Sequence, residues 1–366
     1  MKKVELYKFI VFIWCFIFSV LFSSNAPSES KNNAEIKTIF GPLKLQNELL
    51  KTYNLQYMQR LKDVDRSGSI AYWNGVPKIS RADHCLEMLW LVQNFGGELQ
   101  EQIAALIFDI SESVFSQVTD VVFGIANYQD TIHEWFLQQT GITEIINGHD
   151  WTVKDITPKN PKFKRLHQEF PNMCAENIAY VLHTALALKM VKKDEISFII
   201  SKLHYEDDKW CFTALKAARK FANLSLALAK GFWGAADHLV VYHITGRMLK
   251  RAMLLGRITE HDIHFGIDQQ ILDKLNACDD PEITRLIAKA KIPKTAYRIL
   301  KNGEGTPDFV PKAKFRGIDP WIFYKHSKKF KRLSESQSVP DKKFAKEFMR
   351  AKKSCEKGYK IQLNID

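Results

Sequence analysis

The sequence predicts an all-α protein: a helical bundle with additional C-terminal helices and a small C-terminal β/irregular basic region. Three observations support this class. Hydrophobic residues make up 46% and charged residues 26% of 366 residues, which is ordinary globular composition. Apolar residues recur at helical spacing along most of the chain. β-strand patterns are confined to Tyr297–Leu300 and Tyr359–Ile365.

The N-terminus is predicted to be a signal peptide or an N-terminal membrane anchor covering residues 1–26. Three lysines within the first eight residues precede an apolar run from Phe9 to Phe22, and small residues follow this run. Pro27 would hinder cleavage, so an uncleaved anchor at residues 9–22 stays open beside a cleaved leader. Either way, residues 27–366 are expected to be exported to a periplasmic or other extracytoplasmic location.

A polar linker is predicted at 27–40, and helices follow in order along the chain. Ser80 is a good N-cap for the second of these helices, and Gly96-Gly97 ends it. Loops rich in glycine or proline are expected at 65–77 and 151–171. The predicted helices are Leu45–Lys62, the one after Ser80, Glu98–Ile110, Val114–Phe123, Tyr128–Gln139, Ala175–Met190, two or three within Glu206–Gly256, Glu260–Leu275 and Pro281–Ala290.

The net charge of +12 belongs to the C-terminal fifth of the chain. From Lys289 onward there are 21 Lys and Arg against 8 Asp and Glu, whereas the preceding residues carry 32 against 33. A basic segment of this kind favours anionic partners such as an anionic surface or polymer, although a solvated lysine-rich face explains it as well. We divide the chain into residues 1–26, 27–40, a helical domain at 41–290 and a basic region at 291–366.

Cysteine usage excludes two kinds of site. Five cysteines follow the predicted leader, and they are scattered along the chain without a CxxC pair. Neither a disulfide framework nor a structural zinc site is indicated, and most of these thiols are expected to be buried and free. The sequence also has no GxSxG, no Gly-rich phosphate loop and no HExxH.

Four short motifs, taken in order, carry the functional signal. They are Ser80-Arg81-Ala82-Asp83-His84 at a helix start, Phe108-Asp109 at a helix end leading into Ser111–Ser116, Ile132-His133-Glu134, and Ala175-Glu176-Asn177-Ile178-Ala179-Tyr180. In order and spacing this set resembles the HD superfamily of metal-dependent phosphohydrolases, in particular its deoxynucleoside-triphosphate triphosphohydrolase-like branch. The resemblance covers roughly residues 38–290, with a weaker likeness at 316–320.

The resemblance implies a divalent-metal site that is degenerate in this chain. His84, Asp109 and Glu176 match three of the four ligands, while Phe108 replaces the doublet histidine and cannot bind metal. Glu112 could enter as a replacement ligand. A carboxylate-rich set of this kind favours Mg or Mn over Fe or Zn, and the alternative is that no metal is bound.

The resemblance also implies roles for other residues. His133 would be a general acid oriented by Glu134, and Arg81 would hold phosphate. Tyr180 and His243 fall at positions expected to contact substrate.

Three functions remain open at this point. The first is hydrolysis of a phosphate ester or nucleotide, with a phosphate-containing small molecule as substrate. The second is a catalytically inactive HD pseudoenzyme that acts in binding or interaction. The third is a surface-anchored structural or host-interaction protein whose basic C-terminal region binds an anionic polymer or lipid. Deoxynucleoside triphosphates are cytosolic, so the predicted export argues against the usual substrate of the family for this chain. A homo-oligomer is an expectation from the family alone.

Overall fold

The computed structural model describes residues 33–301 and 303–364. The predicted leader at 1–26 lies outside the described residues. Within the described part of the chain, no helix combines the length and the apolar character that crossing a bilayer requires.

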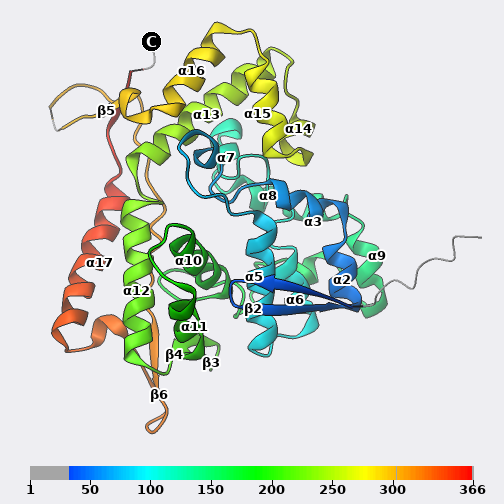
Figure 1. Cartoon of the computed structure of the whole chain (residues 1–366), viewed down its shortest axis with the longest axis vertical. Coiled ribbons are helices and arrows are strands. Elements are labelled where there is room, and N and C mark those ends of the chain that lie inside the picture. The colour runs from blue at the N-terminus through cyan, green and yellow to red at the C-terminus, as the bar shows by residue number, and fades with distance from the viewer. Residues whose placement is uncertain (1–32, 302, 365–366) are drawn as a thin grey trace, which may run out of the picture.

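A bundle of α-helices forms the body of the molecule (Figure 1). The helices are α2 (Asn47–Tyr53), α3 (Gln56–Arg60), α4 (Ile70–Trp73), α5 (Arg81–Asn94), α6 (Leu99–Leu106), α7 (Val118–Phe123), α8 (Tyr128–Leu137), α9 (Ile142–Ile146), α10 (Ala175–Ala187), α11 (Lys193–Ser201), α12 (Leu215–Gly231), α13 (Ala236–Leu254), α14 (Glu260–Phe265), α15 (Asp268–Asn276), α16 (Pro281–Lys291) and α17 (Val339–Lys357). Short 3₁₀ turns occur at Leu61–Asp63, Asn147–His149, Val153–Ile156, Pro293–Thr295 and Leu333–Glu335.

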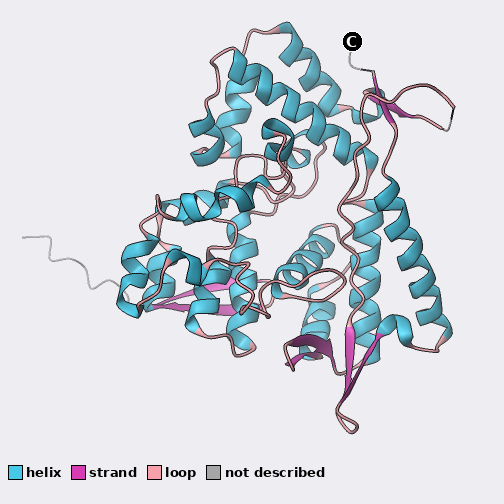
Figure 2. Ribbon diagram, turned by 180° about the vertical axis from the view of Figure 1, so that it is seen from behind, coloured by secondary structure: helices cyan, strands magenta, loops and turns pink. Residues whose placement is uncertain are grey.

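The all-α prediction is wrong, because the described residues also form eight strands in three sheets (Figure 2). The strands are β1 (Asn33–Thr38), β2 (Gly41–Gln46), β3 (Leu203–Glu206), β4 (Lys209–Phe212), β5 (Tyr297–Ile299), β6 (Trp321–Tyr324), β7 (Lys329–Arg332) and β8 (Ile361–Leu363). Pairing is antiparallel within β1–β2, β3–β4, β6–β7 and β5–β8, and parallel between β4 and β6. The fold is therefore mixed, with a helical bundle and small sheets at its periphery.

Two of the unexpected hairpins have local causes. In β2, Leu43 and Leu45 are buried while their neighbours are exposed, which is the period of two that places alternate residues on one face of a strand. The turn between β3 and β4 contains Asp207 and Asp208, both with positive φ. Two consecutive left-handed residues match the right-handed twist of a hairpin, so a strand pair forms where a helix was predicted from Glu206. The linker predicted up to residue 40 contains β1.

Helix α5 is central to the core and packs against α6 on one side and α10 on the other. Its predicted N-cap is confirmed, since the Ser80 side chain accepts a hydrogen bond from the Asp83 backbone N–H. Met88, Leu89 and Leu91 are fully buried on this helix. A capped and tightly packed α5 holds the residues of its first turn in fixed positions.

The C-terminal region folds back onto the bundle instead of forming a separate tail. Helix α17 packs on α12, and Asp341 accepts two hydrogen bonds from the Arg219 guanidinium. The strands predicted near residues 297–300 and 359–365 are confirmed as β5 and β8, which pair with each other. Between β5 and β6 the chain runs along the length of α12 (Figures 1 and 2).

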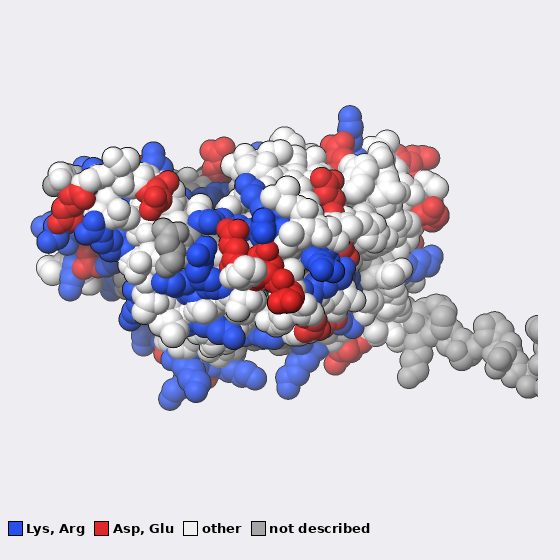
Figure 3. Space-filling view, turned by 90° about the horizontal axis from the view of Figure 1, so that it is seen from above, with Lys and Arg blue, Asp and Glu red and all other residues white. Residues whose placement is uncertain are grey.

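Charged side chains of both signs occupy the face seen in Figure 3. Acidic side chains gather near the centre of this view, and basic side chains extend along its lower edge. Four described cysteines, Cys85, Cys174, Cys211 and Cys278, are buried and free, as predicted, and Cys355 is half-buried and free.

Candidate functional site

A cavity of about 460 Å³ lies where the first turns of α5 and α10, the α6–α7 connection and the β5–β6 connection meet. Because these segments are far apart in the sequence, only the tertiary fold creates this site. Seven of the nine predicted site residues line it: Arg81, His84, Asp109, Glu112, Glu176, Tyr180 and His243.

Arg81 occupies the middle of the acidic part of the cavity. Its guanidinium is 2.8 Å from Asp109 Oδ2 and 2.9 Å from Glu112 Oε2, and it also donates to Ser116 Oγ. Burial by itself lowers the pKa of Arg81, but the two carboxylates outweigh burial and the pKa is raised. The side chain therefore stays positively charged and neutralises two buried acids.

The two acids that share Arg81 respond in opposite directions. Burial tends to raise the pKa of Asp109, but Arg81 and His84 outweigh burial and the pKa lies below the usual value. For Glu112, burial dominates over Arg81, and Asp109 adds repulsion, so the pKa rises to about 7. Asp109 is thus the firmly ionised member of the cluster.

A pH-dependent difference should follow from replacing Glu112 by glutamine. A carboxyl group with a raised folded pKa holds extra protons in the folded state, so its contribution to stability is lost as the pH rises through the folded pKa, here about 7. Glutamine has no such proton. The free energy of unfolding of Glu112→Gln relative to the native chain should therefore increase between about pH 5 and about pH 8 in denaturant titrations.

Asp109→Asn is the control of opposite sign. The pKa of Asp109 is depressed, so its own ionisation changes the free energy of unfolding only in acid. Asp109→Asn also removes the repulsion that raises the pKa of Glu112, so over the same range this variant should differ from the native chain only through a lower pKa of Glu112. A Glu112→Gln difference that falls as the pH rises would contradict this assignment.

His84 faces the cavity with little access to water. It is 3% exposed, and its Nδ1 has no hydrogen-bond partner among the described residues. Burial lowers its pKa to about 3, so the ring is neutral. Its edge-on neighbour is Phe108, with ring centroids 6.4 Å apart, at the position where the resemblance places a histidine ligand.

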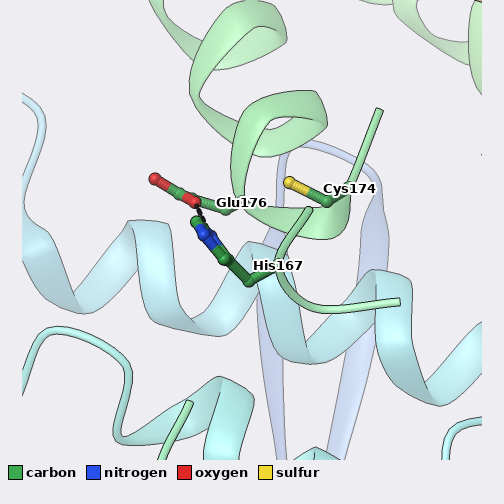
Figure 4. Close-up of side chains that lie close together, drawn as sticks. All are labelled: His167, Cys174 and Glu176. Carbon is green, nitrogen blue, oxygen red and sulfur yellow. Dashed lines mark hydrogen bonds and ion pairs between the residues drawn. The ribbon is translucent and has the colours of Figure 1, made fainter. Parts of the chain in front are cut away.

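These side chains do not fit the predicted four-ligand metal centre. Both oxygens of Asp109 already accept hydrogen bonds, one from Arg81 and the other from Gln129. Among the described residues, only His167, Cys174 and Glu176 form a group of three or more potential ligands with atoms within 4.8 Å of one another (Figure 4). Of the predicted ligands only Glu176 belongs to this group, and an arginine lies between Asp109 and Glu112.

Glu176 projects from the first turn of α10 towards His167, with 2.8 Å between Oε2 and Nδ1. Burial tends to raise the pKa of Glu176, but the hydrogen bond and charge of His167, together with the charge of Arg316, lower it to about 2. The Glu176 carboxylate is therefore ionised, and its histidine partner is His167 instead of the predicted His84.

The predicted proton-transfer pair is not among the residues that line the cavity. His133 is buried on α8, where its Nδ1 lies 2.7 Å from Ser111 Oγ, and burial lowers its pKa to about 4. Glu134 is exposed on the same helix. Ser111 does not line the cavity either, and the two assigned roles stay predictions.

Tyr180 and His243 form part of an aromatic wall. The guanidinium of Arg66 lies 5.9 Å and that of Arg316 lies 5.4 Å from the Tyr180 ring centroid. His243 stacks on Phe309 with centroids 4.0 Å apart. Flat rings beside cationic groups suit a ligand that has both an aromatic and an anionic part.

No protein-family model matches the chain. The chain is 25% identical over 287 residues to an uncharacterised protein, YdhJ, of Bacillus subtilis, which covers 78% of this chain and 87% of YdhJ. It is 23% identical over 286 residues to a protein of Cordyceps militaris named metal-dependent phosphohydrolase cns2, covering 73% and 77% of the two chains.

Solved structures share the fold. A phosphohydrolase from Bacteroides thetaiotaomicron superposes with a TM-score of 0.63 at 15% identity, covering 84% of this chain and 95% of that chain. A hypothetical protein from Aquifex aeolicus superposes with a TM-score of 0.63 at 13% identity, covering 88% and 99%. These two likenesses show the fold that the chain shares, and the name phosphohydrolase belongs to the matched proteins.

Sequence reasoning missed two kinds of cavity residue. Lys314 and Arg316 reach the site from the β5–β6 connection, more than 130 positions after Glu176. His167 lies in a loop with no ligand spacing around it. The weak motif at 316–320 was the available signal for Arg316, whereas no local pattern marks His167.

Proposed function

We propose that this chain is a phosphohydrolase-like protein that binds a phosphate-containing small molecule, a phosphate ester or nucleotide, without hydrolysing it through the centre predicted from the family. The observation that carries this proposal is that Arg81 spans Asp109 and Glu112. A guanidinium cannot polarise a phosphoryl oxygen and activate water in the way that a metal ion does.

The cationic lining of the cavity supports phosphate binding. Arg66, Lys312, Lys314 and Arg316 line it, and none of the four makes an ion pair among the described residues. Burial and the neighbouring charge of Arg81 lower the pKa of Arg66 to about 10. Burial and the charge of Arg316 lower the pKa of Lys314. An anion bound between these groups would relieve their mutual repulsion.

The aromatic wall favours a nucleotide among phosphate compounds. Tyr180, Trp233 and Phe309 line the cavity together with the four cationic side chains named above. A base can stack on such rings while the phosphates meet the guanidinium groups, whose fork geometry suits phosphate oxygens. This assignment agrees with the resemblance to the triphosphohydrolase-like branch.

Replacing Arg316 by alanine should weaken nucleotide binding about tenfold or more, because a charge-assisted hydrogen bond contributes about 1.5–3 kcal/mol. Isothermal titration calorimetry of the full chain with ATP, dGTP and inorganic pyrophosphate measures this effect. Arg298→Ala is the matched control, since Arg298 is exposed on β5 and does not line the cavity. Equal losses in the two variants, or no binding by the native chain, would contradict the proposal.

Hydrolysis is tested on the same samples. Release of phosphate, pyrophosphate or triphosphate from ATP or dGTP in the presence of Mn²⁺ should not exceed that of buffer alone. Release that depends on Mn²⁺ and disappears in Asp109→Asn would show instead that the predicted metal centre forms and acts.

A further inference from the structure

Three side chains of different chemistry meet where the chain enters α10. His167 lies in the preceding loop, Cys174 is the N-cap residue, and Glu176 is in the first turn. One atom from each lies within 4.8 Å of the others, and Figure 4 shows them directed towards one another. We propose that His167, Cys174 and Glu176 form a zinc-type transition-metal site, which shares Glu176 with the centre predicted around His84 and Asp109 but none of its other ligands.

The donor set selects the class of metal. One imidazole nitrogen, one sulfur and one carboxylate oxygen suit a borderline-soft ion such as Zn²⁺, whereas Mg²⁺ and Mn²⁺ prefer all-oxygen sets. In a tetrahedral site with bonds of about 2.0–2.3 Å, neighbouring ligand atoms lie about 3.3–3.8 Å apart. His167 Nδ1 and Glu176 Oε2 are now 2.8 Å apart, so these two atoms have to separate slightly to bind one ion.

The position of Cys174 favours a metal-bound thiolate. Backbone N–H groups of Asn177, Gln168 and Glu176 approach the sulfur, and the positive end of the α10 dipole lies beside it. Burial nevertheless raises the pKa of this thiol, so the free group is protonated. A bound cation supplies the charge that a buried thiolate needs, and its binding releases the proton.

The site has an outlet to the cavity. His167 and Glu176 both line it, whereas Cys174 is 1% exposed and is not among the lining residues. Three protein ligands leave a fourth position, which in zinc proteins is taken by water or by a ligand oxygen. The inference does not rest on the proposed phosphate binding, because the metal can bind when no phosphate ligand does.

Titration of the full chain with Co²⁺ alone tests the site. Cobalt substitutes for zinc in tetrahedral sites, and a bound thiolate gives sulfur-to-cobalt charge-transfer absorption. We expect this absorption to saturate at about one Co²⁺ per chain and to disappear when Zn²⁺ is added. Nucleotide binding is followed separately by calorimetry, so failure of one proposal leaves the other standing.

Matched variants identify the ligands. Cys174→Ser retains an N-cap oxygen and therefore the fold, but should lose the charge-transfer absorption, and His167→Gln should weaken cobalt binding at least tenfold. Cys355→Ser and Glu112→Gln should both retain the absorption. Thermal unfolding confirms that each variant is folded.

Three results would overturn the inference. They are the absence of charge-transfer absorption in the native chain, its persistence in Cys174→Ser, and its loss in Cys355→Ser. Loss in Glu112→Gln would overturn the distinction from the centre predicted earlier.

Discussion

Replacing Arg81 by methionine should lower the free energy of unfolding by about 3–5 kcal/mol, the usual cost of removing one partner from a buried ion pair. Asp109 is 1% and Glu112 is 4% exposed, and in this variant both would lose their buried cationic partner. Denaturant unfolding near neutral pH measures the loss as a lower midpoint at unchanged slope. Part of the stability should return in acid, where Asp109, whose pKa Arg81 lowers in the native chain, becomes protonated.

The matched control is Arg251→Met. Arg251 also bridges two carboxylates, those of Asp280 and Glu282, but its side chain is 39% exposed. An ion pair with a solvent-exposed guanidinium contributes little to stability, so Arg251→Met should cost much less than Arg81→Met. If Arg81→Met and Arg251→Met cost the same small amount, Arg81 is not the group that neutralises the acids of the cavity.

Asp268→Ala should be the second large effect, with a loss of about 3–5 kcal/mol of stability. The carboxylate is fully buried and accepts hydrogen bonds from the backbone N–H groups of Asp65 and Phe115 and from the Tyr72 hydroxyl. Each buried donor left without a partner costs about 1–3 kcal/mol. The variant should therefore unfold at markedly lower denaturant concentration.

Asp268→Asn distinguishes lost hydrogen bonds from lost packing. The amide keeps one carbonyl acceptor and nearly the same volume, so its cost should be smaller than that of alanine. Since Asp268 holds the backbone of Phe115 next to Ser116, which bonds Arg81, nucleotide affinity should fall together with stability in Asp268→Ala. Unchanged stability in Asp268→Ala would contradict the anchoring role.

Much of the helical body could be predicted because its determinants are local. Ser80 caps α5 through contacts within four residues, and the apolar spacing of α5 and α10 is set by their own packing faces. The order of the motifs also brought seven predicted residues to one cavity. The sequence order does not show that Arg81 would bond Asp109 and Glu112, because this depends on side-chain geometry between two elements.

The errors have non-local or subtle local causes. Strands of four to six residues are too short to give a strong periodic pattern, and β4 is completed by β6, more than 100 positions later. Likewise, His167 and Arg316 can be recognised as site residues only when the fold brings them beside Glu176. Contacts between such distant residues produce no local spacing pattern in a single sequence.

The cavity is formed by two parts of the chain that differ in their importance for folding. Helices α5 and α10 contribute lining residues and also core residues, so most substitutions in these helices lower the stability of the fold. The other lining residues, from Phe309 to Arg316, belong to the irregular connection between β5 and β6. Substitutions in this connection alone can therefore change which ligand binds without destabilising the core. The basic C-terminal region sets ligand specificity, whereas the helical bundle holds the other half of the binding site in place.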